Sequence, residues 1–155
     1  MPPKFLFLGV GNRDRGDDGV GPLLAEKLLK NKVLKELGVD ILPHSGEGAS
    51  LMDLWEGTEK TVIVDSMKSG LSVGNIRRFD ARVDRLSGGT FYYSSHLFSL
   101  AEAVEMARQL DRLPSSLIVY GIEGGAYSFG AGLSSKVAKA LPGLAKTICR
   151  EFTDA

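Results

Sequence analysis

Short apolar runs bounded by glycine, proline or charged residues recur along the chain. Their length and their content of branched and aromatic residues are typical of buried β-strands. The segments between them have apolar residues at helical spacing. The pattern predicts five strands, at residues 4–10, 39–42, 61–65, 75–79 and 116–122.

Four segments between and after these runs have the period of an amphipathic helix, at residues 19–31, 49–55, 97–110 and 134–152. In the first, Leu24 and Leu28 share one face, and Pro22 is tolerable because it falls in the first turn. Pro142 is expected to kink or split the last helix. The alternation of strand and helix predicts an α/β fold with a twisted, mostly parallel sheet covered by helices on both faces.

The composition is that of an ordinary globular chain and adds limits on partners. The length of 155 residues suits a single domain spanning residues 1–155. Nineteen basic and 19 acidic side chains balance, which argues against nucleic acid or an anionic membrane as the main partner. Cys149 is the single cysteine, and the start is too short and polar for a secretory signal, so a cytoplasmic location is expected.

The first loop, in FLGVGNRDRGDDGVG at residues 7–21, begins like a nucleotide-binding turn but continues into two adjacent carboxylates, Asp17 and Asp18. Those charges would repel a phosphate. Asp14 also stands where a dinucleotide-binding motif needs its third glycine. The loop is therefore better suited to a cation, with Gly9 and Gly11 allowing a sharp turn close to a bound group.

The other chemically capable side chains also follow predicted strands or begin a predicted helix. Asp65 ends one strand, Glu123 follows another, and His96 lies at the start of a helix. In a parallel sheet the carboxyl ends of the strands meet at one rim, where such folds bind their ligands. Carboxylates and an imidazole there are a ligand set for a divalent transition metal.

Each residue also has a plainer interpretation. Asp17, Asp18 and Asp65 are of a type that caps helices or closes turns, and two serines before His96 would make it an ordinary first-turn residue. His44 follows the second strand and is either a second imidazole at the rim or a solvated loop residue. The combination favours the metal site, with Asp17 assigned to the helix start and Asp18 to the metal.

The remaining candidates have structural explanations. Tyr92 and Tyr93 are interpreted as strand or core aromatics, and Cys149 as a small buried side chain of the last helix.

Four blocks along the chain resemble the signature blocks of the hydrogenase maturation endopeptidases, in order and at similar spacing. They are LGVGNRDRGDDGVGPLLAEKL, VIVDSMKSG, SSHLFSLAEAVEMARQL and VYGIEGGAYSFGAGLSSKVAKAL. The resemblance implies a three-layer α/β/α domain. It also implies an endopeptidase that removes the C-terminal extension of a nickel-iron hydrogenase large-subunit precursor after nickel insertion. Carried over by position, the metal-contacting and catalytic residues are Asp18, Asp65 and His96.

In this resemblance the nickel arrives bound to the precursor, and no permanently bound cofactor is expected. Three ligands without a thiolate should hold free metal only weakly. The chain departs from the common pattern in the charged RDRG run, in Ser66 where alanine is frequent, and in Asp18 where some relatives have glutamate. A non-hydrolytic nickel-binding chaperone or sensor is the alternative, since no serine or cysteine is recognisably placed against His96.

Overall fold

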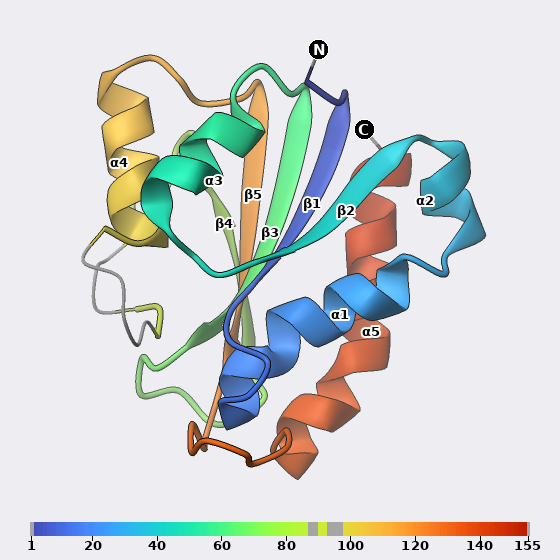
Figure 1. Cartoon of the computed structure of the whole chain (residues 1–155), viewed down its shortest axis with the longest axis vertical. Coiled ribbons are helices and arrows are strands. Elements are labelled where there is room, and N and C mark those ends of the chain that lie inside the picture. Colours follow the sequence, from blue (N-terminus) through green and yellow to red (C-terminus); the bar gives the residue numbers. More distant parts are fainter. Residues whose placement is uncertain (1, 87–89, 93–97, 155) are drawn as a thin grey trace.

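A five-stranded sheet with the strand order β2-β1-β3-β5-β4 forms the centre of the protein (Figure 1). The computed structural model describes residues 2–86, 90–92 and 98–154. β2, β1, β3 and β5 pair parallel with one another in this order, and β4 pairs antiparallel with β5 at one edge. The strands are β1 (Phe5–Val10), β2 (Val39–His44), β3 (Lys60–Met67), β4 (Ile76–Asp80) and β5 (Ser116–Glu123).

The three inner strands are apolar on both faces because helices cover both sides of the sheet. Every residue of β1 is buried, and β3 and β5 are buried after their first residue. The edge strand β2 instead alternates buried and exposed positions at its start. Continuous apolar runs are the pattern of strands enclosed between two helix layers, so the predicted α/β fold with a mostly parallel sheet is confirmed.

Two helix layers enclose the sheet, as Figure 1 shows. Leu6, Leu8 and Ile63 pack with the buried residues of α3 and α4 on one side. The alternate positions Phe7 and Val62 pack with α1, α2 and α5 on the other. The helices are α1 (Val20–Leu28), α2 (Lys32–Glu36), α3 (Gly48–Trp55), α4 (Leu100–Gln109) and α5 (Ser135–Thr153), with a short 3-10 turn η1 (Gly16–Gly19) before α1.

The helices differ from the predicted segments most clearly at the end of α1 and at Pro142, and α4 is also shorter than the predicted segment 97–110. The predicted helix at 19–31 is shorter, because the Asn31 side chain accepts a hydrogen bond from Leu34 N at 3.0 Å and so starts a separate helix, α2. Pro142 does not split α5, which runs through it as one helix. Pro142 lies on the exposed side, where water can hydrate the carbonyl that loses its partner.

Within the described part of the chain, no helix combines the length and the apolar character needed to cross a membrane.

Candidate functional site

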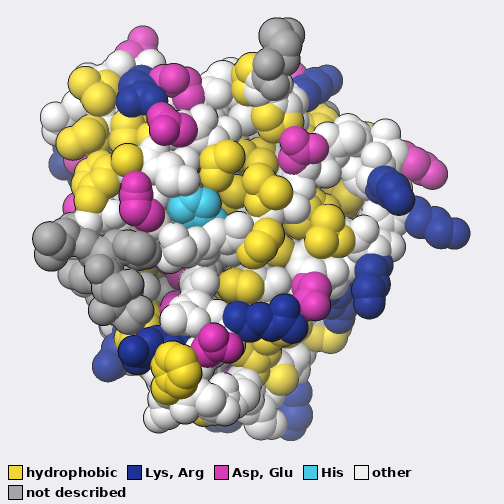
Figure 2. All heavy atoms as spheres, in the orientation of Figure 1, with side chains coloured by type: hydrophobic (Ala, Val, Ile, Leu, Met, Phe, Trp, Pro, Cys, Tyr) yellow, Lys and Arg dark blue, Asp and Glu magenta, His cyan; other side chains and the backbone are white. Residues whose placement is uncertain are grey.

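Asp18 and Asp65 line one cavity at the carboxyl ends of the central strands. Asp18 lies in η1, directly after the loop that follows β1, and Asp65 lies in β3. β1 and β3 are parallel neighbours, so both carboxylates come to the same end of the sheet. The cavity has a volume of about 560 Å³ and its lining also includes Asn12, His44 and Tyr92. Hydrophobic side chains gather around the centre of the face seen in Figure 2, where one imidazole is visible.

Asp18 is only 4% exposed, and each of its two carboxylate oxygens accepts a hydrogen bond. Asn12 N donates to Oδ2 at 2.8 Å, and Ser66 Oγ donates to Oδ1 at 2.9 Å. Burial raises the pKa of Asp18, and these hydrogen bonds and the charge of Arg15 offset the increase only in part. The position of the carboxylate is thus defined before any ligand binds.

Asp65 is the more strongly perturbed member of the pair. It is 3% exposed, and its Oδ1 accepts a hydrogen bond from Ser66 N at 2.8 Å. Burial raises the pKa of Asp65 well above its ordinary value, and the negative charge of Asp18 raises it further. A second negative charge beside Asp18 is therefore disfavoured, and a cation in the cavity would relieve this repulsion.

Ser66 connects the two carboxylates. It is fully buried, its N–H donates to Asp65 and its hydroxyl donates to Asp18. In the sequence, Ser66 is distinguished only by standing where alanine is frequent. The signal available in the sequence was a serine directly after the strand-end aspartate. In a β-strand, the side chain of such a serine points to the opposite face of the sheet from the aspartate before it.

Asp17 does not cap its own helix, which corrects the role expected for it. It lies in η1, but its fully buried carboxylate binds the loop between β5 and α5. Oδ2 accepts from Gly125 N at 2.7 Å, from Ala126 N at 3.1 Å and from Ser134 Oγ, while Oδ1 accepts from Ser134 N at 2.7 Å. Burial acts to raise the pKa of Asp17, but these hydrogen bonds outweigh it and lower the pKa. Asp17 joins the first and last loops of this rim.

Glu123 and His44 also have structural partners. The Glu123 carboxylate accepts hydrogen bonds from Ser69 N, Ser69 Oγ and Gly70 N, so it organises the loop after β3. His44 lines the cavity, with Nδ1 accepting from Gly46 N at 2.9 Å and Nε2 lying 2.9 Å from Ser50 Oγ. His44 is therefore at the rim, as one of its two interpretations required, but in a fixed orientation.

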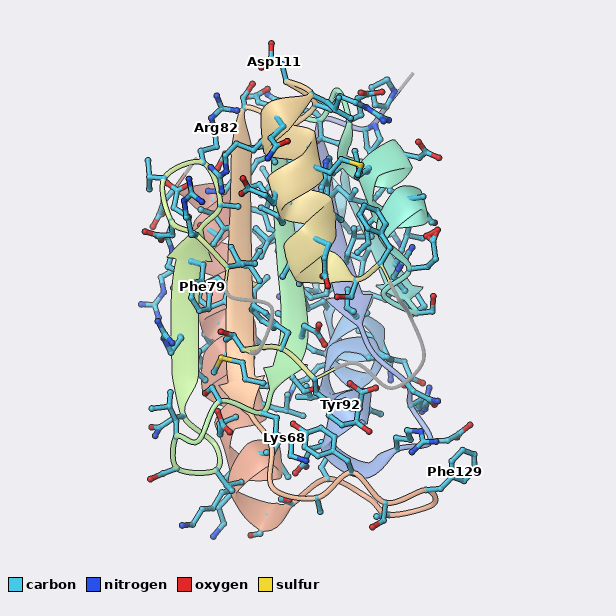
Figure 3. The ribbon with its side chains drawn as sticks, turned by 90° about the vertical axis from the view of Figure 1, so that its left-hand side faces the viewer. Lys68, Phe79, Arg82, Tyr92, Asp111 and Phe129 are labelled. Carbon is cyan, nitrogen blue, oxygen red and sulfur yellow. The ribbon has the colours of Figure 1, made fainter. Side chains whose placement is uncertain are left out.

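The third predicted ligand, His96, lies outside the described residues, as does Tyr93. Tyr92, interpreted from the sequence as a strand or core aromatic, is half-buried and lines the cavity. Its ring, labelled in Figure 3, stacks on Tyr127 with a centroid separation of 3.9 Å. Among the described residues, no three His, Cys, Asp or Glu side chains gather in a way that could hold a metal ion. The described part of the site is the pair of carboxylates.

The two glycines of the first loop serve close packing within the protein. Gly11 has a φ of 140°, and a Cβ at this position would lie 1.9 Å from Asp18 O. A Cβ on Gly9 would lie 2.1 Å from Gly21 O in α1. The sharp turn predicted for Gly11 is present, but the group that approaches is the backbone of η1 and α1, whereas the sequence suggested a bound group.

Comparison with known proteins assigns the chain to a family. A family model described as HycI, hydrogenase maturation protease, matches residues 22–151. The chain belongs to the hydrogenase maturation protease family. Asp65 and the position of His96 fall within the matched segment, and Asp18 lies just before it.

Curated relatives and solved structures agree with this assignment. A putative hydrogenase maturation protease of Methanocaldococcus jannaschii is 30% identical over 145 residues, covering 88% of each chain. The hydrogenase expression/formation protein HupD of Thiocapsa roseopersicina is 29% identical over 78% of this chain, and the match spans only 54% of that protein. The match to HupD of Bradyrhizobium diazoefficiens spans 62% of it.

Among solved structures, the hydrogenase maturating endopeptidase HybD from Escherichia coli superposes with a TM-score of 0.72 at 19% identity, covering 96% of this chain and 90% of that one. The hydrogenase maturation protease HycI from Thermococcus kodakarensis superposes with a TM-score of 0.66 at 22% identity, covering 99% and 94%. These structures share the fold.

Proposed function

We propose that the protein is an endopeptidase that removes the C-terminal extension of a nickel-iron hydrogenase large-subunit precursor after nickel insertion. Asp18, Asp65 and His96 contact the nickel that the precursor carries, and no cofactor is permanently bound. The observation that supports this most is the buried pair Asp18 and Asp65 on one cavity, where burial and mutual repulsion raise the pKa of Asp65.

Such a pair is suited to detecting a cation held by another molecule. Without a cation, burial and the charge of Asp18 disfavour ionisation of Asp65, and with a cation both carboxylates gain an opposite charge. A carboxylate has about four lone-pair sites, so the hydrogen bonds from Asn12 and Ser66 leave capacity for a metal. A precursor without nickel lacks that charge and binds weakly.

The hydrolytic step requires an activated water and a polarised peptide carbonyl. A carboxylate of the pair can accept the proton of the attacking water, or the precursor's nickel can polarise the carbonyl. In either route Ser66 and Asn12 keep Asp18 in a fixed orientation, which reduces the reorganisation needed in the transition state.

The test is incubation of the purified protein with a nickel-loaded large-subunit precursor that still has its C-terminal extension. We expect a shortened product whose mass corresponds to loss of the extension, and no product from the nickel-free precursor. Asp65→Asn and His96→Ala should abolish cleavage. Asp14→Asn, an exposed carboxylate in the same first loop, is the matched control and should retain it.

A wild-type protein that binds the loaded precursor and leaves it intact would refute the peptidase assignment. That result would instead support the alternative, a nickel-binding chaperone or sensor of hydrogenase assembly.

A further inference from the structure

Phe129 is an exposed aromatic side chain on an anchored loop at the rim of the site. The residue is 71% exposed, and Figure 3 shows its ring projecting away from the body of the protein. Single exposed apolar residues are common on protein surfaces and carry no meaning alone. Phe129 differs from the others because of how its loop is held and what lies next to it.

The loop that carries Phe129 is fastened along its length to the loop that carries the candidate site. Phe129 forms an antiparallel bridge with Arg15, and Gly130 N donates to Asp14 O at 2.7 Å. Asp17 N donates to Ala126 O at 2.8 Å, and the Asp17 carboxylate adds its bonds to the same loop. The backbone is therefore ordered before any partner binds, which lowers the entropic cost of an interface.

Arg15 links Phe129 to the site. Its guanidinium lies 5.6 Å from the centre of the Phe129 ring, and its charge lowers the pKa of Asp18 against the larger effect of burial. Asp18 N also donates to Arg15 O at 3.0 Å, so Arg15 contacts both the Phe129 ring and the turn that carries Asp18. Aromatic residues and arginine are the types that most often dominate the energetics of protein interfaces.

We propose that Phe129 and Arg15 form a docking contact for the folded protein substrate, separate from the nickel contacts. The proposal rests on the proposed function, because a precursor that presents its metal to Asp18 must cover the adjoining rim. The partner surface is an apolar recess that receives the Phe129 ring, with a carboxylate at its edge opposite Arg15. Binding there supplies affinity for the precursor and no chemistry.

The experiment compares Phe129→Ala with Val83→Ala, a matched control that removes a 75% exposed apolar side chain from the turn after β4. The bridge to Arg15 is made by the backbone, so Phe129→Ala should melt within a few degrees of the wild type. Affinity for the nickel-loaded precursor, measured by calorimetry, should fall about tenfold or more in Phe129→Ala. It should not change in Val83→Ala.

Two further readouts distinguish docking from a structural role. The KM for precursor cleavage should rise in Phe129→Ala while kcat and the affinity for free Ni²⁺ stay at wild-type values. Arg15→Gln should reduce the salt dependence of precursor binding.

Unchanged precursor affinity in Phe129→Ala, or a loss of Ni²⁺ binding or of thermal stability in that variant, would overturn the docking proposal. Binding is measured apart from cleavage. A wild-type protein that binds the precursor without cutting it refutes the proposed function and leaves the docking comparison decisive, whereas normal cleavage with unchanged affinity in Phe129→Ala refutes docking alone.

Discussion

Replacing Asp17 by asparagine should destabilise the fold far more than an exposed substitution in the same loop. The buried carboxylate accepts four hydrogen bonds from the loop before α5, three of them at Oδ2 and one at Oδ1. An asparagine can place its oxygen at only one of these positions. If the oxygen replaces Oδ2, the amide nitrogen faces Ser134 N, and two donors meet at a contact that was 2.7 Å.

The expected cost follows from the change in each bond. A hydrogen bond to a charged group contributes about 1.5–3 kcal/mol and a neutral one about 0.5–1.5 kcal/mol. Asparagine weakens the retained bonds, removes one and adds a repulsive contact. We therefore expect the free energy of unfolding to fall by about 3 kcal/mol at neutral pH. For a domain of this size that corresponds to a melting temperature lower by roughly 6–12 °C.

Urea denaturation followed by circular dichroism measures this difference, with Asp14→Asn as the exposed control. The native pKa of Asp17 is lowered below 3.8, so its stabilisation is complete above pH 3.8 and is lost as pH falls through the native pKa. The difference in free energy of unfolding between wild type and Asp17→Asn should accordingly become smaller in strong acid. An Asp17→Asn variant within about 0.5 kcal/mol of wild type at neutral pH would refute the structural role assigned to this carboxylate.

Three further predictions concern the carboxylate pair. Asp65→Asn should raise the melting temperature of the metal-free protein at pH 7. The native pKa of Asp65 is above 3.8, so the wild type loses stability as pH rises from 3.8 through that native pKa. Thermal melts at pH 7 and below pH 3.8 check this, and a melting temperature at pH 7 below that of the wild type contradicts it. Ser66→Ala should weaken Ni²⁺ binding about tenfold, since residues that orient metal ligands have effects of this order. Calorimetry measures this change, and an affinity equal to that of the wild type would contradict the prediction. The affinity for Ni²⁺ should rise with pH as Asp65 gives up its proton. Calorimetry in buffers of different ionisation enthalpy should detect this proton release. Binding that is independent of pH would show that Asp65 is not a ligand.

The sheet could be predicted because its inner strands are enclosed on both faces. This enclosure makes β1, β3 and β5 continuous apolar runs, and such runs are visible in the sequence without knowledge of any distant contact. The same pattern locates strand ends, so Asp18 and Asp65 could be placed at one rim. The start of α2 was also within reach, because Asn31 is a favourable capping residue.

The role of Asp17 could not be predicted from local pattern. Its hydrogen-bond partners lie 108 to 117 residues away in the chain, and the hydroxyl that binds Asp18 comes from a residue 48 positions away. An aspartate at the start of a helix has the same local appearance whether it caps that helix or binds a remote loop. Only the three-dimensional structure distinguishes the two.

The bonds from Asp17 to the last loop also affect when the rim can form during protein synthesis. Its four donors belong to Gly125, Ala126 and Ser134, so a nascent chain that has not reached these residues contains none of them. Closing a loop of this length carries an entropic cost that is met only when the distant contact forms. Because synthesis proceeds from the amino terminus, β1 and Asp18 emerge early, yet the rim reaches its final geometry only after the residues that lead into α5 have left the ribosome.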